Sequence, residues 1–150
     1  TGIGNRRAWN EATTRAAVEF AADPLHSTIT VVMGDLDRLK HVNDTHGHEA
    51  GDDLIRAAAQ VFLDAAPPGA LVARLGGDEF GMLVVGAGID SSVLVGAVRE
   101  RMQCVPPVHG VPVSLSVGAA SCPPLADVEA ILAAADSLAF ADKAARRIGR

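Results

Sequence analysis

The sequence predicts an α+β fold, in which helices pack against a sheet that contains an antiparallel hairpin. Two apolar runs at residues 71–75 and 80–85 flank a Gly-Gly-Asp-Glu stretch at residues 76–79, which is the pattern of a hairpin. Four other segments carry apolar residues at helical spacing, and two further apolar runs have the length of strands. The resulting order is helix, strand, helix, hairpin, helix, strand, helix, which favours a sheet covered by helices.

The first half of the chain predicts two helices and one strand. Residues 6–22 have an apolar face at helical spacing, formed by Trp9, Ala12, Ala16 and Phe20. Residues 29–33 are a short β-branched run, which indicates a buried strand. Residues 49–66 predict the second helix, and the helix dipole favours Asp52 in its first turn.

The second half adds two helices and a strand outside the hairpin. Helices are predicted at residues 91–104 and from residue 128 to about 145. At residues 113–117 apolar side chains alternate with Ser114 and Ser116, so we expect a half-buried strand. The inward face expected for the last helix consists of Val128, Ile131, Leu132, Ala135, Leu138 and Ala139.

Size and charge limit the possible functions. The chain has 150 residues, 49% of them apolar, and is expected to fold as a single domain with its own core. It begins with Thr1 and not with Met, so we expect a piece of a longer multidomain protein. The formal net charge of −5 excludes a surface built to hold a nucleic-acid backbone, which needs a dense positive footprint. A small triphosphate still fits, because it needs only a local group of donors and a cation.

Cysteine content and hydropathy indicate the cellular compartment in which the domain is expected to lie. Cys104 and Cys122 show no CxxC pattern and are expected to be reduced, buried thiols of a cytosolic protein. No apolar run reaches the ~18 residues that a membrane span needs, and no signal peptide is recognisable. We expect a cytoplasmic domain that makes no membrane contact itself, which leaves any tethering to other parts of the protein.

Acidic residues gather at two places where strands end. Asp35 and Asp37 follow the first strand, and Asp78 and Glu79 lie in the hairpin turn. If the hairpin pairs beside the first strand, Asp35 and Asp78 converge, and two converging carboxylates are a natural site for a hard cation such as Mg²⁺. The alternative is that these are ordinary solvated loop charges, which is the better interpretation of an isolated Asp-x-Asp.

Glycines and basic residues near the acids suit a polyphosphate. Gly76 and Gly77 carry no side chains, so a phosphate chain can approach the backbone closely beside the acids. Lys40 follows the first acidic group, and Lys143 and Arg147 share a face if the last helix continues past residue 145. From spacing alone, a solvated helix end favoured by the C-terminal dipole is the better interpretation of Lys143 and Arg147.

Asn43 and Asp52 form a further polar pair. Asp52 can accept hydrogen bonds from N1–H and the amino group of guanine, and Asn43 can meet another edge of the base. The alternative is that Asn43 is a turn residue and that Asp52 is an acid at a helix start. Spacing alone favours this alternative. His41, His46 and His48 lack the cysteine or carboxylate spacing of a metal site, so His48 is expected to order the loop.

Short motifs recur in order along essentially the whole chain. Residues 74–80 read RLGGDEF, and residues 35–40 read DLDRLK. These resemble the signature and the DxDxFK motif of the GGDEF family of diguanylate cyclases. The other matching stretches are residues 1–8 (TGLPNRRA in the family), 43–48 (NDxxGH), 51–52 (GD), 113–118 (VSxSxG) and 135–147 (ADxALYxAKxxGR). Because the series is long and ordered, the resemblance is very specific.

The resemblance implies a fold and a set of residue roles. The fold would be the palm-like antiparallel sheet that class III nucleotide cyclases and some polymerases share. Asp35 and Asp78, with the carbonyl of Leu36, would bind Mg²⁺ or Mn²⁺, and Glu79 would be a second essential acid, as a ligand of a second metal or as a base. The implied GTP contacts are backbone N–H groups at Arg38 and Leu39, the turn glycines Gly76 and Gly77, the cations Lys40, Lys143 and Arg147, and the guanine readers Asn43 and Asp52.

The implied reaction condenses two GTP molecules into cyclic di-GMP. One domain holds one GTP, so a second copy in an antiparallel homodimer must supply the attacking 3′-OH. The alternative within the family is a catalytically silent module that binds GTP or a cyclic dinucleotide. A generic Mg²⁺-dependent phosphotransferase or phosphatase is the alternative outside it, and this does not explain the basic and guanine-reading pairs together.

The chain also departs from the family pattern in several places. Arg146 stands where the family has Gly, Phe140 where it often has Tyr, and Leu39 where it has Phe. Many members carry an RxxD product-binding sequence before the GGDEF turn, but residues 67–70 here read PPGA. This stretch has no guanidinium or carboxylate to hold a guanine, so no allosteric product site is expected there.

Overall fold

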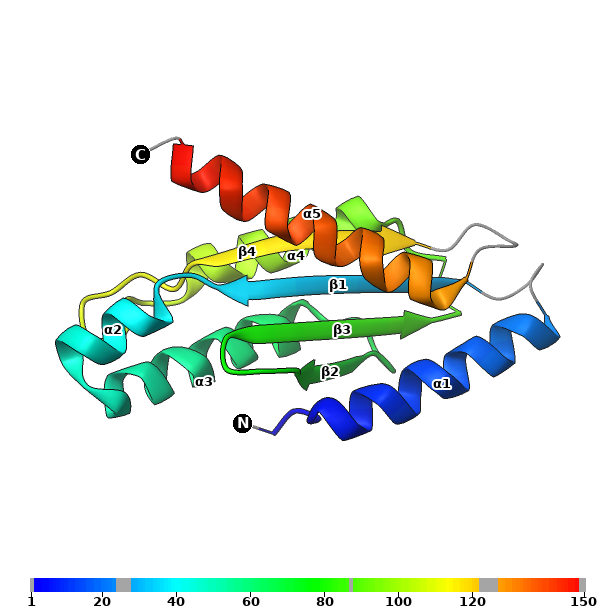
Figure 1. Cartoon of the computed structure of the whole chain (residues 1–150), viewed down its shortest axis with the longest axis horizontal. Helices are drawn as coiled ribbons and strands as arrows, with labels where there is room; N and C mark the ends of the chain where they lie inside the picture. The colour runs from blue at the N-terminus through cyan, green and yellow to red at the C-terminus, as the bar shows by residue number, and fades with distance from the viewer. Residues whose placement is uncertain (1, 24–27, 87, 122–126, 149–150) are drawn as a thin grey trace.

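The computed structural model describes residues 2–23, 28–86, 88–121 and 127–148. Its elements are α1 (Arg6–Ala22), β1 (Ile29–Leu36), α2 (Leu39–His46), α3 (His48–Ala65), β2 (Leu71–Arg74), β3 (Glu79–Val85), α4 (Ser91–Cys104), β4 (Leu115–Ser121) and α5 (Val128–Ile148). Within the described residues the strands form one antiparallel sheet in the order β2-β3-β1-β4 (Figure 1). The α+β prediction, including a hairpin that pairs beside the first strand, is confirmed.

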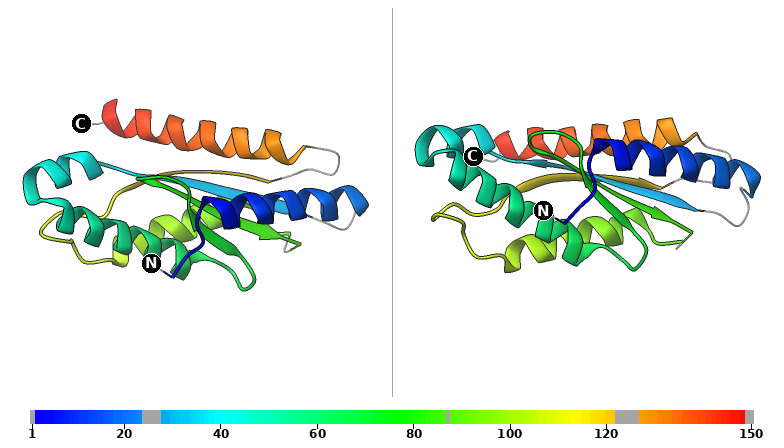
Figure 2. Two further views of the ribbon diagram at one scale, coloured as in Figure 1. Left: turned by 60° about the horizontal axis from the view of Figure 1, so that its bottom comes forward. Right: turned by 90° about the horizontal axis from the view of Figure 1, so that it is seen from below.

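Helices cover both faces of this sheet. α1 and α5 lie on one face, and α3 and α4 lie on the other, while α2 extends beyond the end of β1 and packs on α3 (Figure 2). Each face therefore has its own core. Phe62 of α3 stacks on Phe80 of β3 in one core, and Trp9 and Phe20 of α1 are buried in the other.

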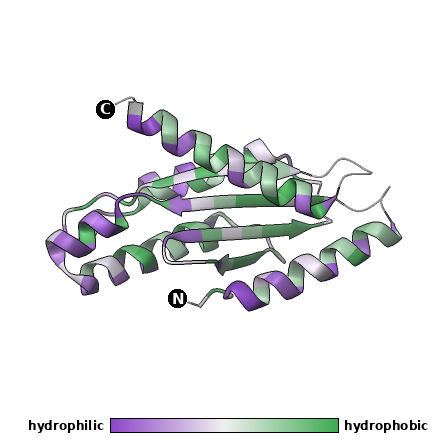
Figure 3. Cartoon of the chain, in the orientation of Figure 1, coloured by the Kyte–Doolittle hydropathy of each residue, from purple (hydrophilic) through white to green (hydrophobic). Residues whose placement is uncertain are grey.

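The two-residue period of the strands decides which core each side chain enters. In β1, Val32 lies in the core beneath α3 and α4, whereas Val31 lies in the core beneath α1 and α5. By the same alternation Asp35 faces α1 and α5. Glu79, the residue directly opposite Asp35 in β3, faces the same side. Figure 3 shows β1 and β3 apolar over most of their length and hydrophilic at this end.

Two strands differ from the prediction in their bounds. β1 continues to Leu36, because its pairing with β3 and β4 extends past Gly34. Asp35 therefore belongs to the strand and does not follow it. β4 covers Leu115–Ser121, later than the predicted residues 113–117. It is not half-buried: α4 and α5 cover its two faces, and Ser116 is fully buried.

The short helix α2 was not predicted. Only Leu39 and Val42 of its eight residues are apolar, which is too few to establish a helical period in the sequence. Asn43 lies within this helix and is not a turn residue. Because α3 begins at His48, Asp52 lies just past its first turn, where Glu49 is the acidic residue instead.

Other expectations about exposure were wrong or fall outside the described residues. Cys104 is exposed at the end of α4 and is not a buried thiol, while Cys122 lies outside the described residues. Leu138 is exposed on α5, although its helical position suggested the core. In the part of the chain that the structure describes, no helix is both long and apolar enough to cross a bilayer.

Candidate functional site

Chemically active side chains gather at one end of the sheet. The end of β1, the β2–β3 turn, α2 and the last turns of α5 all lie at this end of the molecule (Figure 1). The turn is fixed against β1, because the N–H of Leu36 donates a 2.8 Å hydrogen bond to the carbonyl oxygen of Asp78. The hairpin therefore brings Asp78 beside Asp35, as the sequence predicted.

Asp35 lies in a crowded electrostatic environment. Its carboxylate forms an ion pair with the Nζ of Lys143 on α5, and both side chains are about one quarter exposed, at 29% and 25%. Burial raises the pKa of Asp35 above its ordinary value, and the negative charges of Asp78 and Asp37 act in the same direction. The hydrogen bond and charge of Lys143 oppose this shift without cancelling it. Burial thus makes the charged form of Asp35 costly even beside Lys143.

A hard divalent cation fits this set of donors. Asp35 and Asp78 offer carboxylate oxygens and Leu36 a backbone carbonyl, which are the ligands that Mg²⁺ and Mn²⁺ prefer. Among the described residues no group of three or more His, Cys, Asp or Glu side chains is arranged to hold a metal. A cation held by this pair would therefore take its other ligands from water and substrate, as Mg²⁺ does in phosphate-transferring sites.

The turn before β3 is held by two arginines that sequence reasoning missed. The guanidinium of Arg74 donates to the carbonyl oxygens of Gly76 and Gly77 at 2.9 and 2.8 Å. Arg6 of α1 donates to the carbonyl oxygen of Leu75 and forms a 3.2 Å ion pair with Glu79. Both arginines lie inside the matched motifs, but nothing in their spacing indicates that they would bind the turn.

The Glu79 side chain lies close over Gly76 in the turn. A Cβ atom at residue 76 would lie 2.7 Å from the Oε2 of Glu79, so a larger residue there would displace the Glu79 carboxylate. At Gly77 a Cβ atom would meet nothing within 4 Å, so this side of the turn is open. The predicted close approach of a ligand to the backbone is thus sterically possible at Gly77.

Two adjoining cavities flank Lys143. The larger, of about 460 Å³, is lined by Asp35, Glu79, Asp136, Ser137, Ala139, Phe140 and Lys143. The smaller, of about 170 Å³, is lined by Asp37, Arg38, Lys143, Arg146 and Arg147. The first holds the acids, and the second is predominantly basic. Lys143 and Arg147 thus belong to a concave site and are not only a solvated helix end.

The loop into α2 has a constrained backbone. Arg38 is the N-cap of α2 and adopts a left-handed conformation, with φ of 65° and ψ of 15°. Such conformations are costly for residues other than glycine and cluster at functional sites. No side chain caps this helix start, so its first N–H groups, including that of Leu39, are available to an anion. Lys40 is exposed in the same turn and has no partner among the described residues.

Asn43 and Asp52 are placed near one another by the packing of α2 on α3. A Cβ atom at Gly51 would lie 1.8 Å from the Oδ1 of Asn43, so the Asn43 side chain packs directly over Gly51. Asp53 is engaged by Arg56 and by a 2.7 Å bond to His109, which lowers the pKa of Asp53. Asp52 is exposed and has no such partner in the described part of the chain. It is therefore the acid of this pair that is free to meet a ligand.

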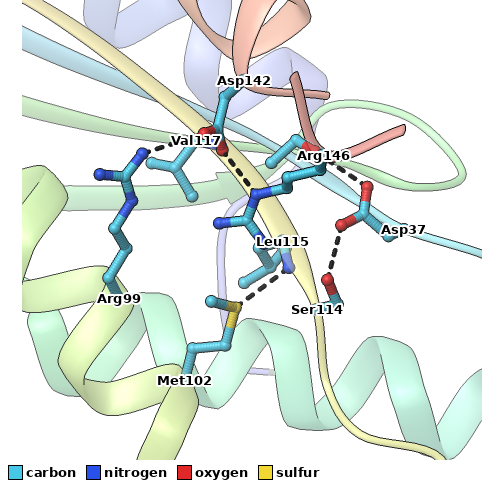
Figure 4. A network of polar contacts seen from close by, with 9 residues as sticks. Asp37, Arg99, Met102, Ser114, Leu115, Val117, Asp142 and Arg146 are labelled. Atoms are coloured by element: carbon cyan, nitrogen blue, oxygen red, sulfur yellow. Dashed lines mark hydrogen bonds and ion pairs between the residues drawn. The ribbon is translucent and has the colours of Figure 1, made fainter. Parts of the chain in front are cut away.

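Polar residues of β4 and α5 form a network beside the basic cavity (Figure 4). The carboxylate of Asp37 accepts hydrogen bonds from Ser114 and Ser116 at 2.6 and 2.9 Å, which ties the β1–α2 loop to β4. Asp142 holds Arg146, as described below. The alternation of Ser114 and Ser116 is visible in the sequence, but their shared partner, Asp37, is not.

Comparisons with known proteins identify the family of the chain. The family model described as "Diguanylate cyclase, GGDEF domain" matches residues 1–148. An uncharacterised Streptomyces griseus protein encoded in the hutH 5′ region is 34% identical over 99% of this chain and 62% of its own length. The diguanylate cyclase DgcS of Shewanella oneidensis is 28% identical over 98% of this chain and 49% of its own. The chain thus spans about half to two thirds of these curated relatives.

Solved structures extend the similarity to three dimensions. The GGDEF domain of DgcB from Caulobacter crescentus, in complex with c-di-GMP, superposes with a TM-score of 0.83 at 28% identity. The alignment covers 97% of this chain and 88% of that one. The palm-like cyclase fold is thereby confirmed, and the chain belongs to the GGDEF domain family of diguanylate cyclases.

Proposed function

We propose that this chain is an active diguanylate cyclase, which converts two GTP molecules into cyclic di-GMP and two pyrophosphates. In each half-reaction a ribose 3′-OH attacks an α-phosphorus, a new P–O bond forms, the bond to pyrophosphate breaks and the hydroxyl proton is released. The observation that carries the proposal is the convergence of Asp35, Asp78 and Lys143 at one end of the sheet, with the pKa of Asp35 raised. Excess negative charge and a shared cation are what a metal-triphosphate site requires.

Asp35, Asp78 and the carbonyl of Leu36 would hold Mg²⁺ or Mn²⁺ in this proposal. When bound, the metal supplies acidity for the attacking hydroxyl and charge neutralisation for the leaving pyrophosphate. Glu79 lies opposite Asp35 across the β1–β3 ladder and lines the same cavity. From there it can serve as a second metal ligand or accept the hydroxyl proton. Its 3.2 Å ion pair with Arg6 links the carboxylate to α1.

The phosphates are proposed to run from the acids past Lys143. Lys143 lines both cavities, so one ammonium can contact phosphate oxygens on either side of it. Arg147 and Lys40 add positive charge, and the N–H groups of Arg38 and Leu39 donate from the start of α2. The open side of the turn at Gly77, beside Gly76, leaves room for the chain to pass the backbone.

The guanine base is proposed to bind between α2 and α3. The carboxylate of Asp52 accepts from N1–H and the amino group of guanine, while the Asn43 amide meets another edge. Adenine presents an acceptor at N1, so the same carboxylate repels it. The Asn43 side chain lies against Gly51, directly before Asp52 in α3, which supports placing both side chains at one base.

A second copy of the domain must supply the other GTP, so the active species is proposed to be a transient antiparallel homodimer. The alternative is a catalytically silent module that keeps the fold and binds GTP or a cyclic dinucleotide. Incubation with GTP and Mg²⁺, followed by chromatography, separates the possibilities. Cyclic di-GMP supports the proposal, unchanged GTP supports the silent module, and GDP indicates a phosphatase.

A further inference from the structure

We propose that Arg146 is an additional phosphate-binding residue that selects for the terminal phosphate of the nucleotide, and that Asp142 is the positioning residue that holds it. The inference rests on the proposed GTP site and assigns a residue that the motifs do not contain. Arg146 lines the smaller cavity together with Arg38, Lys143 and Arg147. Four basic residues and one acid, Asp37, line that cavity, and this excess of positive charge suits a polyanion.

The guanidinium of Arg146 is held from one side only. Its Nε donates a 3.1 Å hydrogen bond to the Oδ2 of Asp142, one helical turn earlier on α5 (Figure 4). No described residue accepts a hydrogen bond from its Nη atoms. Fixing Nε removes much of the freedom of a long side chain and leaves the remaining N–H donors for a ligand. Arg146 is therefore oriented before any phosphate arrives.

Asp142 is itself fixed to the sheet. The same Oδ2 accepts a 2.9 Å hydrogen bond from the N–H of Val117 in β4, and Oδ1 accepts a 3.0 Å bond from Arg99 of α4. Only 18% of the Asp142 side chain is exposed. A carboxylate fixed by a strand and by a second helix is a rigid support, unlike an ordinary surface pair at this helical spacing.

The position of the cavity indicates which phosphate Arg146 would meet. Asp35 and Glu79, which belong to the proposed reaction centre, line the larger cavity, whereas Arg146 lines the smaller one. Lys143 lines both cavities. A triphosphate that extends past Lys143 brings its outer phosphates toward Arg146. Arg146 should therefore strengthen binding of a triphosphate more than that of a diphosphate and should affect KM more than kcat.

The test measures binding without turnover. Affinities for 3′-deoxy-GTP and 3′-deoxy-GDP, which lack the attacking hydroxyl, are measured by calorimetry with Mg²⁺ for Arg146→Gln, Arg146→Lys and Asp142→Asn. Arg101→Gln is the matched control, because it removes an exposed arginine of α4 that lines no cavity named here. We expect Arg146→Gln to weaken triphosphate binding roughly three- to tenfold, because the lost contact is charge-assisted but partly exposed. Diphosphate binding should change less. Arg146→Lys should be intermediate, because it keeps the charge and loses the fork.

As a single substitution, Asp142→Asn should weaken triphosphate binding. It should have little further effect when it is combined with Arg146→Gln. Such non-additivity distinguishes positioning through Arg146 from a general loss of structure. Thermal unfolding of each variant checks the fold.

Product formation from GTP is recorded in parallel. Unchanged triphosphate affinity in Arg146→Gln, or equal losses for both nucleotides, overturns the assignment of Arg146 while the cyclase proposal stands. Arg146-dependent binding without cyclic di-GMP supports the assignment and overturns the cyclase proposal. Absence of triphosphate binding in the unmodified chain overturns both.

Discussion

Asp35 of β1 and Lys143 of α5 are 108 residues apart in the sequence and form an ion pair at the end of the sheet. This pair connects the strand that carries the acids to the helix that carries the phosphate-facing cations. It neutralises part of the charge of Asp35, but burial and the charges of Asp78 and Asp37 still raise its pKa. The charged form of Asp35 therefore has an energetic cost in the folded protein.

Asp35→Asn should abolish turnover and leave the fold at least as stable at pH 7. The folded-state pKa is raised, so the contribution of Asp35 to stability is fully present below its unfolded value of about 3.9 and is lost as the pH rises through the folded-state pKa. At neutral pH the neutral amide removes this cost. Urea unfolding between about pH 4 and 7 should show the variant's advantage growing with pH.

A variant at an acid away from the site provides the control. Asp64→Asn changes an exposed carboxylate of α3 and should show no such advantage. Mg²⁺ with a non-reactive GTP analogue should raise the Tm of the unmodified chain more than that of Asp35→Asn. An Asp35→Asn variant that is clearly less stable at pH 7, or that gains as much Tm from Mg²⁺, would contradict this description of the charge imbalance.

Asp52→Ser should weaken the preference for GTP over ATP. A charge-assisted contact to guanine is worth ~1.5–3 kcal/mol, which corresponds to a change of about tenfold or more in selectivity. Competition assays with equal GTP and ATP measure the ratio. Asp53→Asn is the matched control, since this neighbouring acid is already engaged by His109 and Arg56. An unchanged ratio in Asp52→Ser would mean that the base is read elsewhere.

Specific activity should rise with protein concentration. Each product molecule needs two facing domains, and no sustained heptad pattern that would hold the chain as a coiled-coil dimer is present in the sequence. Initial rates across a dilution series, with parallel sedimentation measurements, test this. Constant specific activity in a sample that sediments as a monomer would contradict the requirement for two copies.

Cyclic di-GMP should not lower kcat at saturating GTP. The stretch at residues 67–70 is closed by a hydrogen bond from the N–H of Ala70 to the carbonyl oxygen of Pro67, so that donor is already used. The stretch has no charged side chain for a guanine. Initial rates over a grid of GTP and cyclic di-GMP separate competition, which raises KM only, from inhibition at a second site. Potent inhibition that persists at saturating GTP would reveal a product site elsewhere.

Periodicity and turn signals predicted the four long helices and the hairpin because each carries a strong apolar pattern. They missed α2, where Val42 alone is buried, and they could not place Asp142 beside Val117, since such contacts depend on how α5 crosses the sheet. The convergence of Asp35 and Asp78 was predictable once the hairpin was assumed to pair with the first strand. The supporting arginines Arg6 and Arg74 were not, because nothing local distinguishes them from solvated charges.

The central claim is tested most directly by the stoichiometry of products. The unmodified chain is incubated with GTP and Mg²⁺ beside Asp78→Asn, after circular dichroism has established that both are folded, and pyrophosphate and cyclic di-GMP are quantified in the same samples. We expect two pyrophosphates for each cyclic di-GMP from the unmodified chain and neither product from Asp78→Asn. Unchanged GTP with the unmodified chain, or near-normal product formation by the folded Asp78→Asn variant, would contradict it.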